Sequence, residues 1–141
     1  MLAVSCHGDT VNEGEVYFAL QAGHDVDPAV ITNRLGISPT RVMRKADPTP
    51  KLSSWELSSG RVVDEVVDVY EMSSQLVSRL TPLAEPIQRL MSELNLSAVL
   101  QVVLRVTMDD AKSTPAIGFD PETIRFLCSV SASIDVDTYR T

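Results

Sequence analysis

The same short phrase occurs near both ends of the chain and constrains the fold more than any other feature. Residues 26–31 read Val-Asp-Pro-Ala-Val-Ile, and residues 119–124 read Phe-Asp-Pro-Glu-Thr-Ile. Aspartate followed by proline is typical of a helix start, because the carboxylate caps free backbone amides and proline suits the first turn. We therefore predict helices that begin after Asp27 and Asp120. The recurrence indicates either two similar structural units in one domain or a chance match between common helix starts.

Apolar residues at every second position predict the strands. The longest such row runs from residue 98 to residue 108, and this segment is expected to be the central strand. Shorter rows over residues 15–22, 53–58 and 134–139 predict three more strands, each with one face in the core. Residues 115–119 predict a short strand or an extended lead into the second Asp-Pro helix.

Apolar residues spaced by three or four positions predict the helices. Residues 63–80 form the longest such segment, and residues 81–95 form a second one that begins at Thr81-Pro82. The first Asp-Pro helix is expected to end at Gly36, and residues 38–52 are expected to form a long loop. In the second Asp-Pro helix the predicted buried stripe consists of Ile124, Leu127 and Cys128.

Together these elements predict an α+β fold in a single domain over residues 15–141, preceded by a flexible leader over residues 1–14. The expected topology is ferredoxin-like, with pseudo-duplicated βαβ units and an antiparallel or mixed sheet that carries its helices on one face. The other face of the sheet would then expose Tyr17, Gln21, Glu56, Gln101, Val103, Arg105, Asp135 and Tyr139. A partner protein or a second subunit could cover that face.

Composition limits the classes of partner. The formal net charge of −7 repels phosphate backbones and anionic lipid, so we expect no nucleic acid or membrane partner and favour a basic protein. No apolar run approaches the ~20 residues of a membrane span. The opening residues lack the pattern of a signal peptide, and Cys6 and Cys128 are too few for a disulfide framework. These observations predict a cytoplasmic protein in which Cys128 belongs to the core.

Residues that could support catalysis are sparse. The only histidines are His7, in the predicted leader, and His24, at the end of a predicted strand. A metal site near His24 would need Asp27, which the helix start already uses as a cap. No phosphate-binding glycine loop, nucleophile elbow or paired-cysteine motif occurs. We therefore expect no enzymatic activity, no cofactor and no metal.

One basic cluster forms a local exception in this acidic chain. Thr40, Arg41, Arg44 and Lys45 precede Trp55, so guanidinium groups and an indole could together hold a carboxylate or a phosphate. The alternative interpretation is that Trp55 belongs to the core and that the cations lie in a solvated loop. The five residues are the candidate ligand-binding site of this sequence.

Several phrases along the chain resemble those of one bacterial family. They are the strand that ends at Gly23, Asp27-Pro28 with Ile31, the phrase Leu35-Gly36-Ile37-Ser38-Pro39-Thr40, the strand around Trp55, and the closing residues Ile134 to Tyr139. In these features the chain resembles domain of unknown function 4279 over residues 15–140. The resemblance implies a fold but no activity, and no catalytic residue is carried over from it.

Two functional hypotheses follow. The first is a non-enzymatic protein-binding module, such as an immunity-type protein that neutralises a basic toxin through its acidic surface. The second is a sensor or regulatory domain that holds a small anionic ligand near Arg41 and Arg44 and acts as a homodimer.

Overall fold

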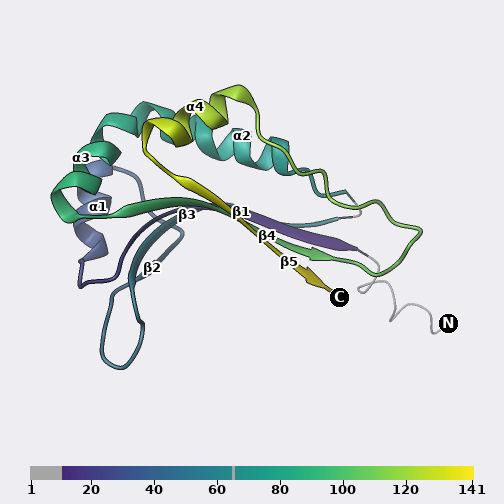
Figure 1. The fold of residues 1–141 in the computed structure, drawn as a ribbon, viewed down its shortest axis with the longest axis horizontal. Coiled ribbons are helices and arrows are strands. Elements are labelled where there is room, and N and C mark those ends of the chain that lie inside the picture. The colour runs from purple at the N-terminus through teal and green to yellow at the C-terminus, as the bar shows by residue number, and fades with distance from the viewer. Residues whose placement is uncertain (1–10, 65) are drawn as a thin grey trace.

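A five-stranded sheet carries its helices on one face, which is the predicted α+β arrangement (Figure 1). The computed structural model of the protein describes residues 11–64 and 66–141. The elements are β1 (Asn12–Ala22), α1 (Pro28–Leu35), β2 (Arg41–Met43), β3 (Ser53–Asp64), α2 (Val69–Leu80), the 3-10 helix η2 (Thr81–Leu83), α3 (Ala84–Leu94), β4 (Ser97–Val106), α4 (Pro121–Ser129) and β5 (Ser133–Arg140).

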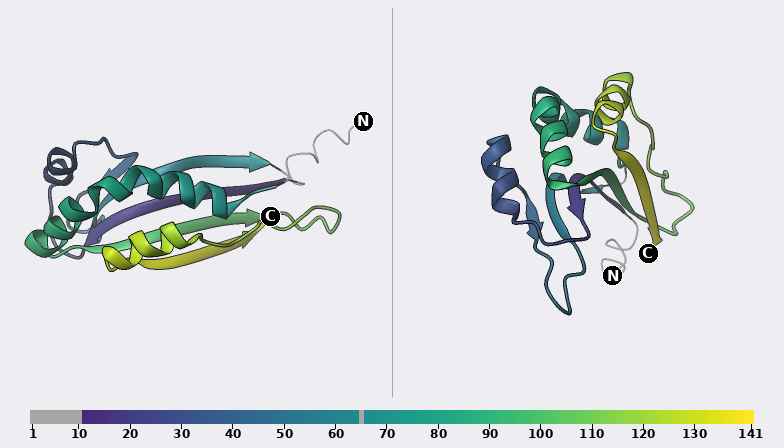
Figure 2. Two further views of the ribbon diagram at one scale, coloured as in Figure 1. Left: turned by 90° about the horizontal axis from the view of Figure 1, so that it is seen from above. Right: turned by 60° about the vertical axis from the view of Figure 1, so that its left-hand side comes forward.

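The sheet is mixed, with the strand order β2-β3-β1-β4-β5. The central strand β1 pairs antiparallel with both β3 and β4, and β3 pairs antiparallel with β2. Only β4 and β5 are parallel, and α4 connects them across the helical face (Figure 2). The longest alternating row, which became β4, thus lies beside the central strand rather than forming it.

This order does not confirm the ferredoxin-like pseudo-duplication. In the second unit, α4 connects two neighbouring parallel strands. In the first unit, α1 connects β1 to β2, and the chain then turns back so that β3 lies between these two strands. The two Asp-Pro helices therefore begin alike but lead to different strand pairings, because the cap determines only where a helix starts.

Both predicted helix starts are confirmed. The Asp27 carboxylate accepts a hydrogen bond from Ala29 N at 3.0 Å, and the Asp120 carboxylate accepts one from Thr123 N at 2.8 Å. Each proline occupies the first helical residue, where its missing N–H costs nothing. The first helix ends at Gly36, which has a φ of 74° and adopts the left-handed conformation that favours glycine.

The core lies between the sheet and the helices. The alternating rows of β1 and β4 contribute Val16, Phe18, Leu100 and Leu104, each at most 1% exposed, as their pattern predicts. The Phe18 ring meets the Phe126 ring of α4 edge to face, with 5.6 Å between the ring centroids. Among the other core side chains that are less than 2% exposed are Trp55, Leu76, Leu80, Ile87 and Leu90.

Three predicted boundaries are wrong, and strand pairing is the reason. β1 begins at Asn12 rather than Glu15, and β3 continues to Asp64 instead of ending at Ser58. The two strands pair from Asn12 opposite Asp64 to Ala22 opposite Ser53, with one irregularity next to Glu15. These ladder hydrogen bonds override the helical spacing that begins at Val63, so α2 starts only at Val69. The remaining leader, residues 1–10, lies outside the described residues.

The predicted stripe of α4 is partly wrong. Leu127 is buried, but Ile124 is 53% exposed and Cys128 is also exposed, so Cys128 does not belong to the core. Phe126 lies in the core instead, where its large ring meets Phe18 and gains more from burial. Among the helices of the described residues, none is both long and apolar enough to span a membrane.

Candidate binding surface

The face of the sheet opposite the helices, here called the open face, is not covered by any helix of the described residues (Figure 2). Side chains alternate along each strand, so this face takes the residues between those that point toward the helices, and some of its own residues, such as Ala19 and Ser54, are buried by their neighbours. It consists of Glu13, Glu15, Tyr17, Ala19 and Gln21 in β1, Arg41 and Met43 in β2, Ser54, Glu56, Ser58, Arg61 and Val63 in β3, Ser97, Val99, Gln101, Val103 and Arg105 in β4, and Ser133, Asp135, Asp137 and Tyr139 in β5. All eight residues predicted for this face are among them.

A first ion-pair network joins β1, β2 and β3 on the open face. Arg41 Nε donates to Glu56 Oε1 at 2.8 Å, and Arg41 Nη2 lies 2.8 Å from Glu15 Oε2. The Ser54 hydroxyl donates to the second Glu56 oxygen at 3.1 Å, and the Ser58 hydroxyl donates to Glu15. The Glu56 side chain is only 10% exposed, so Arg41 compensates a largely buried carboxylate.

Tyr17 lies beside this network. Its ring faces the Arg41 guanidinium, whose carbon lies 4.9 Å from the ring centroid. Burial, followed by the charge of Glu56, raises the pKa of the Tyr17 phenol, and the charge of Arg41 opposes this effect. The phenol therefore stays protonated at neutral pH and can donate a hydrogen bond to a partner.

A second network joins β1, β3 and β4. The Glu13 carboxylate lies 2.6 Å from Arg61 Nη2 and 3.8 Å from Arg105 Nε. The Arg105 guanidinium also lies over the Tyr139 ring of β5, 5.1 Å from the centroid. Beside these groups is a hollow of about 180 Å³ lined by Glu13, Gly14, Glu15, Arg61, Val103 and Arg105.

The β5 side of the open face is acidic. Asp137 Oδ2 accepts a hydrogen bond from Gln101 Nε2 at 3.2 Å, and Asp135 lies two positions earlier on the same face. Neither aspartate forms an ion pair with another residue that the structure describes. Because three arginines face five carboxylates on the open face, its charge is negative overall.

The five residues of the predicted ligand site do not converge. Trp55 is fully buried on the helical face, where its Nε1 donates to Thr32 Oγ1 of α1 at 3.1 Å. Arg41 lies on the open face, and the Thr40 hydroxyl accepts a hydrogen bond from Ser58 N at 3.0 Å. The sheet therefore separates the indole from the Arg41 guanidinium.

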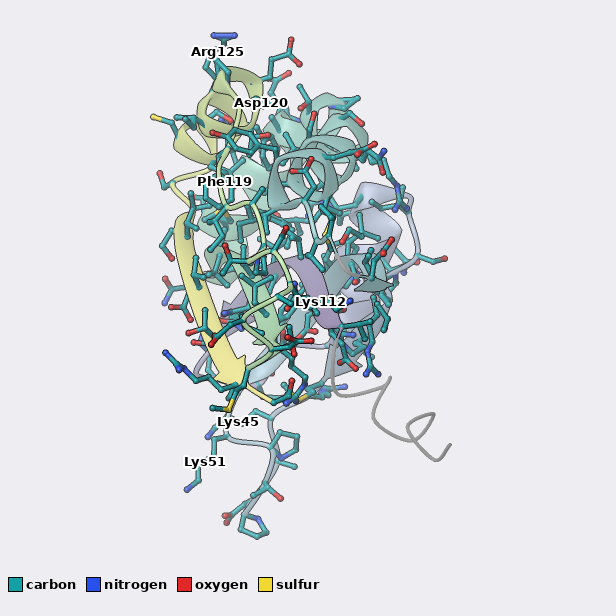
Figure 3. All side chains as sticks on the ribbon, turned by 90° about the vertical axis from the view of Figure 1, so that its right-hand side faces the viewer. Lys45, Lys51, Lys112, Phe119, Asp120 and Arg125 are labelled. Atoms are coloured by element: carbon teal, nitrogen blue, oxygen red, sulfur yellow. The ribbon has the colours of Figure 1, made fainter. Side chains whose placement is uncertain are left out.

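The remaining cations of the predicted site lie at the hairpin between β2 and β3. Arg44 Nε donates to Asp25 Oδ1 at 2.7 Å, and this hydrogen bond lowers the pKa of Asp25. Lys45 and Lys51 project from the end of the molecule opposite Asp120 (Figure 3). They share a hollow of about 370 Å³ with Asp25 and Asp47, so carboxylates already accompany the cations there.

Groups suited to catalysis are scattered in the described part of the chain. His24 Nε2 lies 2.9 Å from the carbonyl oxygen of Leu94, a contact that joins the end of β1 to α3. Residues 11–64 and 66–141 contain no group of three or more histidine, cysteine, aspartate or glutamate side chains placed to hold a metal ion. Cys6 and His7 lie outside these residues.

Sequence reasoning missed both ion-pair networks. It grouped cations that are close in the chain, whereas each network joins residues of three different strands, such as Glu13 with Arg61 and Arg105. One signal was available: Glu13, Glu15 and Tyr17 occupy alternate positions, so they share one face of a strand. Their arginine partners depended on the strand order.

The fold and the open face define a small α+β domain with a polar sheet surface. The chain belongs to the family described as Domain of unknown function (DUF4279), whose model matches residues 10–141. No curated protein matches the chain. No solved structure matches it either.

Proposed function

We propose that this domain is a non-enzymatic protein-binding module that recognises a basic protein through its open face. The observation that carries the proposal is the contrast between the two faces of the sheet. One face is sealed by helices, while the other presents charged and aromatic side chains that neighbouring strands hold in place. Side chains held in this way lose little conformational entropy when a partner binds.

The composition of the open face supports a protein partner. Its arginines and tyrosines belong to the residue types that contribute most binding energy in protein interfaces. Arg105 and Tyr139 form one such pair, and Arg41 and Tyr17 form another. The excess of carboxylates, together with the net charge of −7, steers a basic partner toward the domain. An immunity-type role against a basic toxin belongs to this proposal, as does a reducing cytoplasm, which suits the exposed thiol of Cys128.

Capture from the native host with matched charge variants tests the proposal. The tagged full chain is compared with Arg105→Glu, on the open face, and with Arg89→Glu, on α3 at the helical face. Both substitutions make the same change in net charge at residues that are more than half exposed. We expect a partner retained at low salt by the wild type and by Arg89→Glu but lost by Arg105→Glu, because only the second substitution removes the guanidinium that lies over Tyr139, while the added negative charge is common to both variants. Equal retention by both variants, or no retained protein at all, would overturn the proposal.

The alternative, a sensor of small anions acting as a homodimer, has weaker support. An anion at Arg41 or Arg44 would have to displace carboxylates that lie 2.7 to 2.8 Å from the guanidinium groups. A thermal-shift screen with anionic metabolites separates the two functions, because a ligand that binds only the native state raises the melting temperature. A clear shift that disappears in Arg41→Met would favour the sensor.

A further inference from the structure

β5 is a long strand at the edge of the sheet. Among residues 11–64 and 66–141 it pairs only with β4, and seven of its eight residues are exposed, the exception being Asp137. Thr141 N donates to Val106 O at 3.0 Å, and Met108 N donates to Thr141 O at 3.2 Å, so the backbone groups of Thr141 point toward β4. The backbone N–H and C=O groups of a strand point alternately to its two sides. The register between β4 and β5 is continuous, so the N–H and C=O groups of Ile134, Val136 and Thr138 point away from β4. No strand of the described residues pairs with these groups, so an added strand could do so.

The side chains of β5 alternate in chemistry. Asp135 and Asp137 lie on the open face, whereas Ile134 and Val136 lie on the helical face and are 41% and 39% exposed. An added strand would therefore meet carboxylates on one face and apolar side chains on the other. Cross-strand pairs of opposite charge and of apolar residues stabilise such pairing.

A second copy of this chain fits the edge poorly. In a symmetric antiparallel pair, each residue faces a residue on the same side of the sheet. When Asp135 or Asp137 lies on the two-fold axis of such a pair, that aspartate faces its own copy. When Val136 lies on the axis, Asp135 faces Asp137 of the other copy. Like charges directly opposite each other are destabilising, so the registers with the longest overlap are disfavoured.

A hollow adjoins the end of this edge. Its volume is about 530 Å³, and Val106, Met108, Asp110, Thr138 and Tyr139 are among its lining residues. Met108 and Tyr139 are 65% and 48% exposed, so they offer apolar surface to an incoming residue. Apolar anchors in pockets commonly provide much of the affinity for an extended peptide.

We propose that β5 is a docking site for an extended basic segment of a protein partner, which adds to the sheet as a sixth strand. Its basic residues face Asp135 and Asp137, its alternate apolar residues cover Ile134 and Val136, and a terminal apolar residue enters the hollow beside Met108. This inference rests on the proposed protein-binding function and names the edge and the chemistry of the partner segment.

Synthetic peptides test the pairing directly on the full chain. The probe is a labelled peptide as long as β5 with alternating lysine and valine and a leucine at one end. A control peptide of the same composition groups its lysines together, which keeps the charge but loses the alternation. We expect the alternating peptide to bind more tightly than the grouped one in fluorescence anisotropy. Asp135→Asn/Asp137→Asn should raise its Kd roughly threefold to tenfold, because each exposed charge pair contributes only modestly. Glu85→Gln/Glu122→Gln removes the same charge from helices and should leave the Kd unchanged.

Backbone pairing gives a signature that charge attraction alone cannot produce. On binding, the amides of Val136 and Thr138 should become protected from hydrogen exchange, whereas those of Asp135 and Asp137 already point toward β4 and should change little. Val136→Pro removes an outward N–H without removing a β4 hydrogen bond, so the fold should persist while peptide binding is lost. Far-UV circular dichroism checks that the fold persists, and Ile134→Lys tests the edge independently of proline.

Several results would overturn the edge proposal. They are equal binding of the two peptides, absence of binding, unchanged protection at Val136, or full binding by the folded Val136→Pro and Ile134→Lys variants. Absence of binding would mean that Asp135 and Asp137 merely guard the edge against aggregation. The host partner then distinguishes the two proposals: a partner lost by Arg105→Glu but retained by Val136→Pro supports the open face and excludes the edge. A partner retained by Arg105→Glu but lost by Val136→Pro supports the edge and excludes the open face.

Discussion

Removing the Arg41 guanidinium should destabilise the fold mainly by leaving Glu56 without its charged partner. Arg41→Met keeps much of the apolar stem but deletes the donor that lies 2.8 Å from Glu56 Oε1. The Glu56 side chain is 10% exposed, and among the described residues its carboxylate would keep the Ser54 hydroxyl, at 3.1 Å, as a hydrogen-bond donor. A largely buried carboxylate would then be poorly compensated.

The exposures of the two partners determine the expected size of this effect. Deleting one partner of a fully buried ion pair costs about 3–5 kcal/mol, while an exposed pair contributes about 0–1 kcal/mol. The Arg41 side chain is 45% exposed, so water partly screens the interaction. We therefore expect the free energy of unfolding to fall by about 2 kcal/mol, between these two limits. Arg41→Met/Glu56→Gln should be more stable than Arg41→Met, because it no longer buries the uncompensated charge of Glu56, while Glu15 loses Arg41 in both variants.

Urea unfolding measures these differences, with the fluorescence of the single tryptophan, Trp55, as the signal. Arg44→Met is the matched control, since Arg44 and its partner Asp25 have side chains that are 54% and 61% exposed. We expect the control to unfold at the same urea concentration as the wild type. Two results would refute this reasoning: Arg41→Met unfolding at the same urea concentration as the wild type, or the double variant being less stable than Arg41→Met. Either result would mean that the buried charge of Glu56 does not determine the stability of this network.

Three further predictions concern the core and a helix cap. Gly14→Ala should cost about 1–3 kcal/mol, because its Cβ would lie 2.5 Å from Val67 Cγ1, whereas Gly23→Ala, with open space around it, should be neutral in the same urea assay. Trp55→Ala should cost about 3–5 kcal/mol, measured by circular dichroism, because the side chain is fully buried; a small loss would contradict its place in the core. The hydrogen bond from the Thr123 N–H lowers the pKa of Asp120 in the folded state. Its stabilisation is complete above the unfolded pKa and disappears as pH falls through the folded pKa, so Asp120→Ala and wild-type melting temperatures should converge in acid.

Short-range physics explains why parts of the fold could be predicted. The alternation in β1 and β4 identified the buried faces because side chains of a strand point to opposite sides whatever their neighbours are. Asp27 and Asp120 identified two helix starts because a cap needs only amides two or three residues away. The open face was predictable for the same reason as the buried one.

The candidate ligand site shows where this local reasoning ends. Arg41 and Trp55 are close in the sequence, but the pleat of adjacent strands places them on opposite faces of the sheet. Predicting their separation required the pairing of Val42 with Trp55 and of Arg41 with Glu56. That register depends on the hairpin between β2 and β3, which the sequence indicated only as a long loop.

The sequence alone determined the α+β class, the acidic charge, the buried faces of the main strands and the starts of two helices, since each depends on neighbours within a few residues. Only the tertiary structure decided the strand order, the extension of β3 to Asp64, the partners of Glu13 and Arg41, and the position of β5 at the edge of the sheet. These features depend on contacts between segments far apart in the chain. The free energy that stabilises them comes from hydrogen bonds between strands and from burial shared by distant segments. A pattern of neighbouring residues cannot predict either contribution.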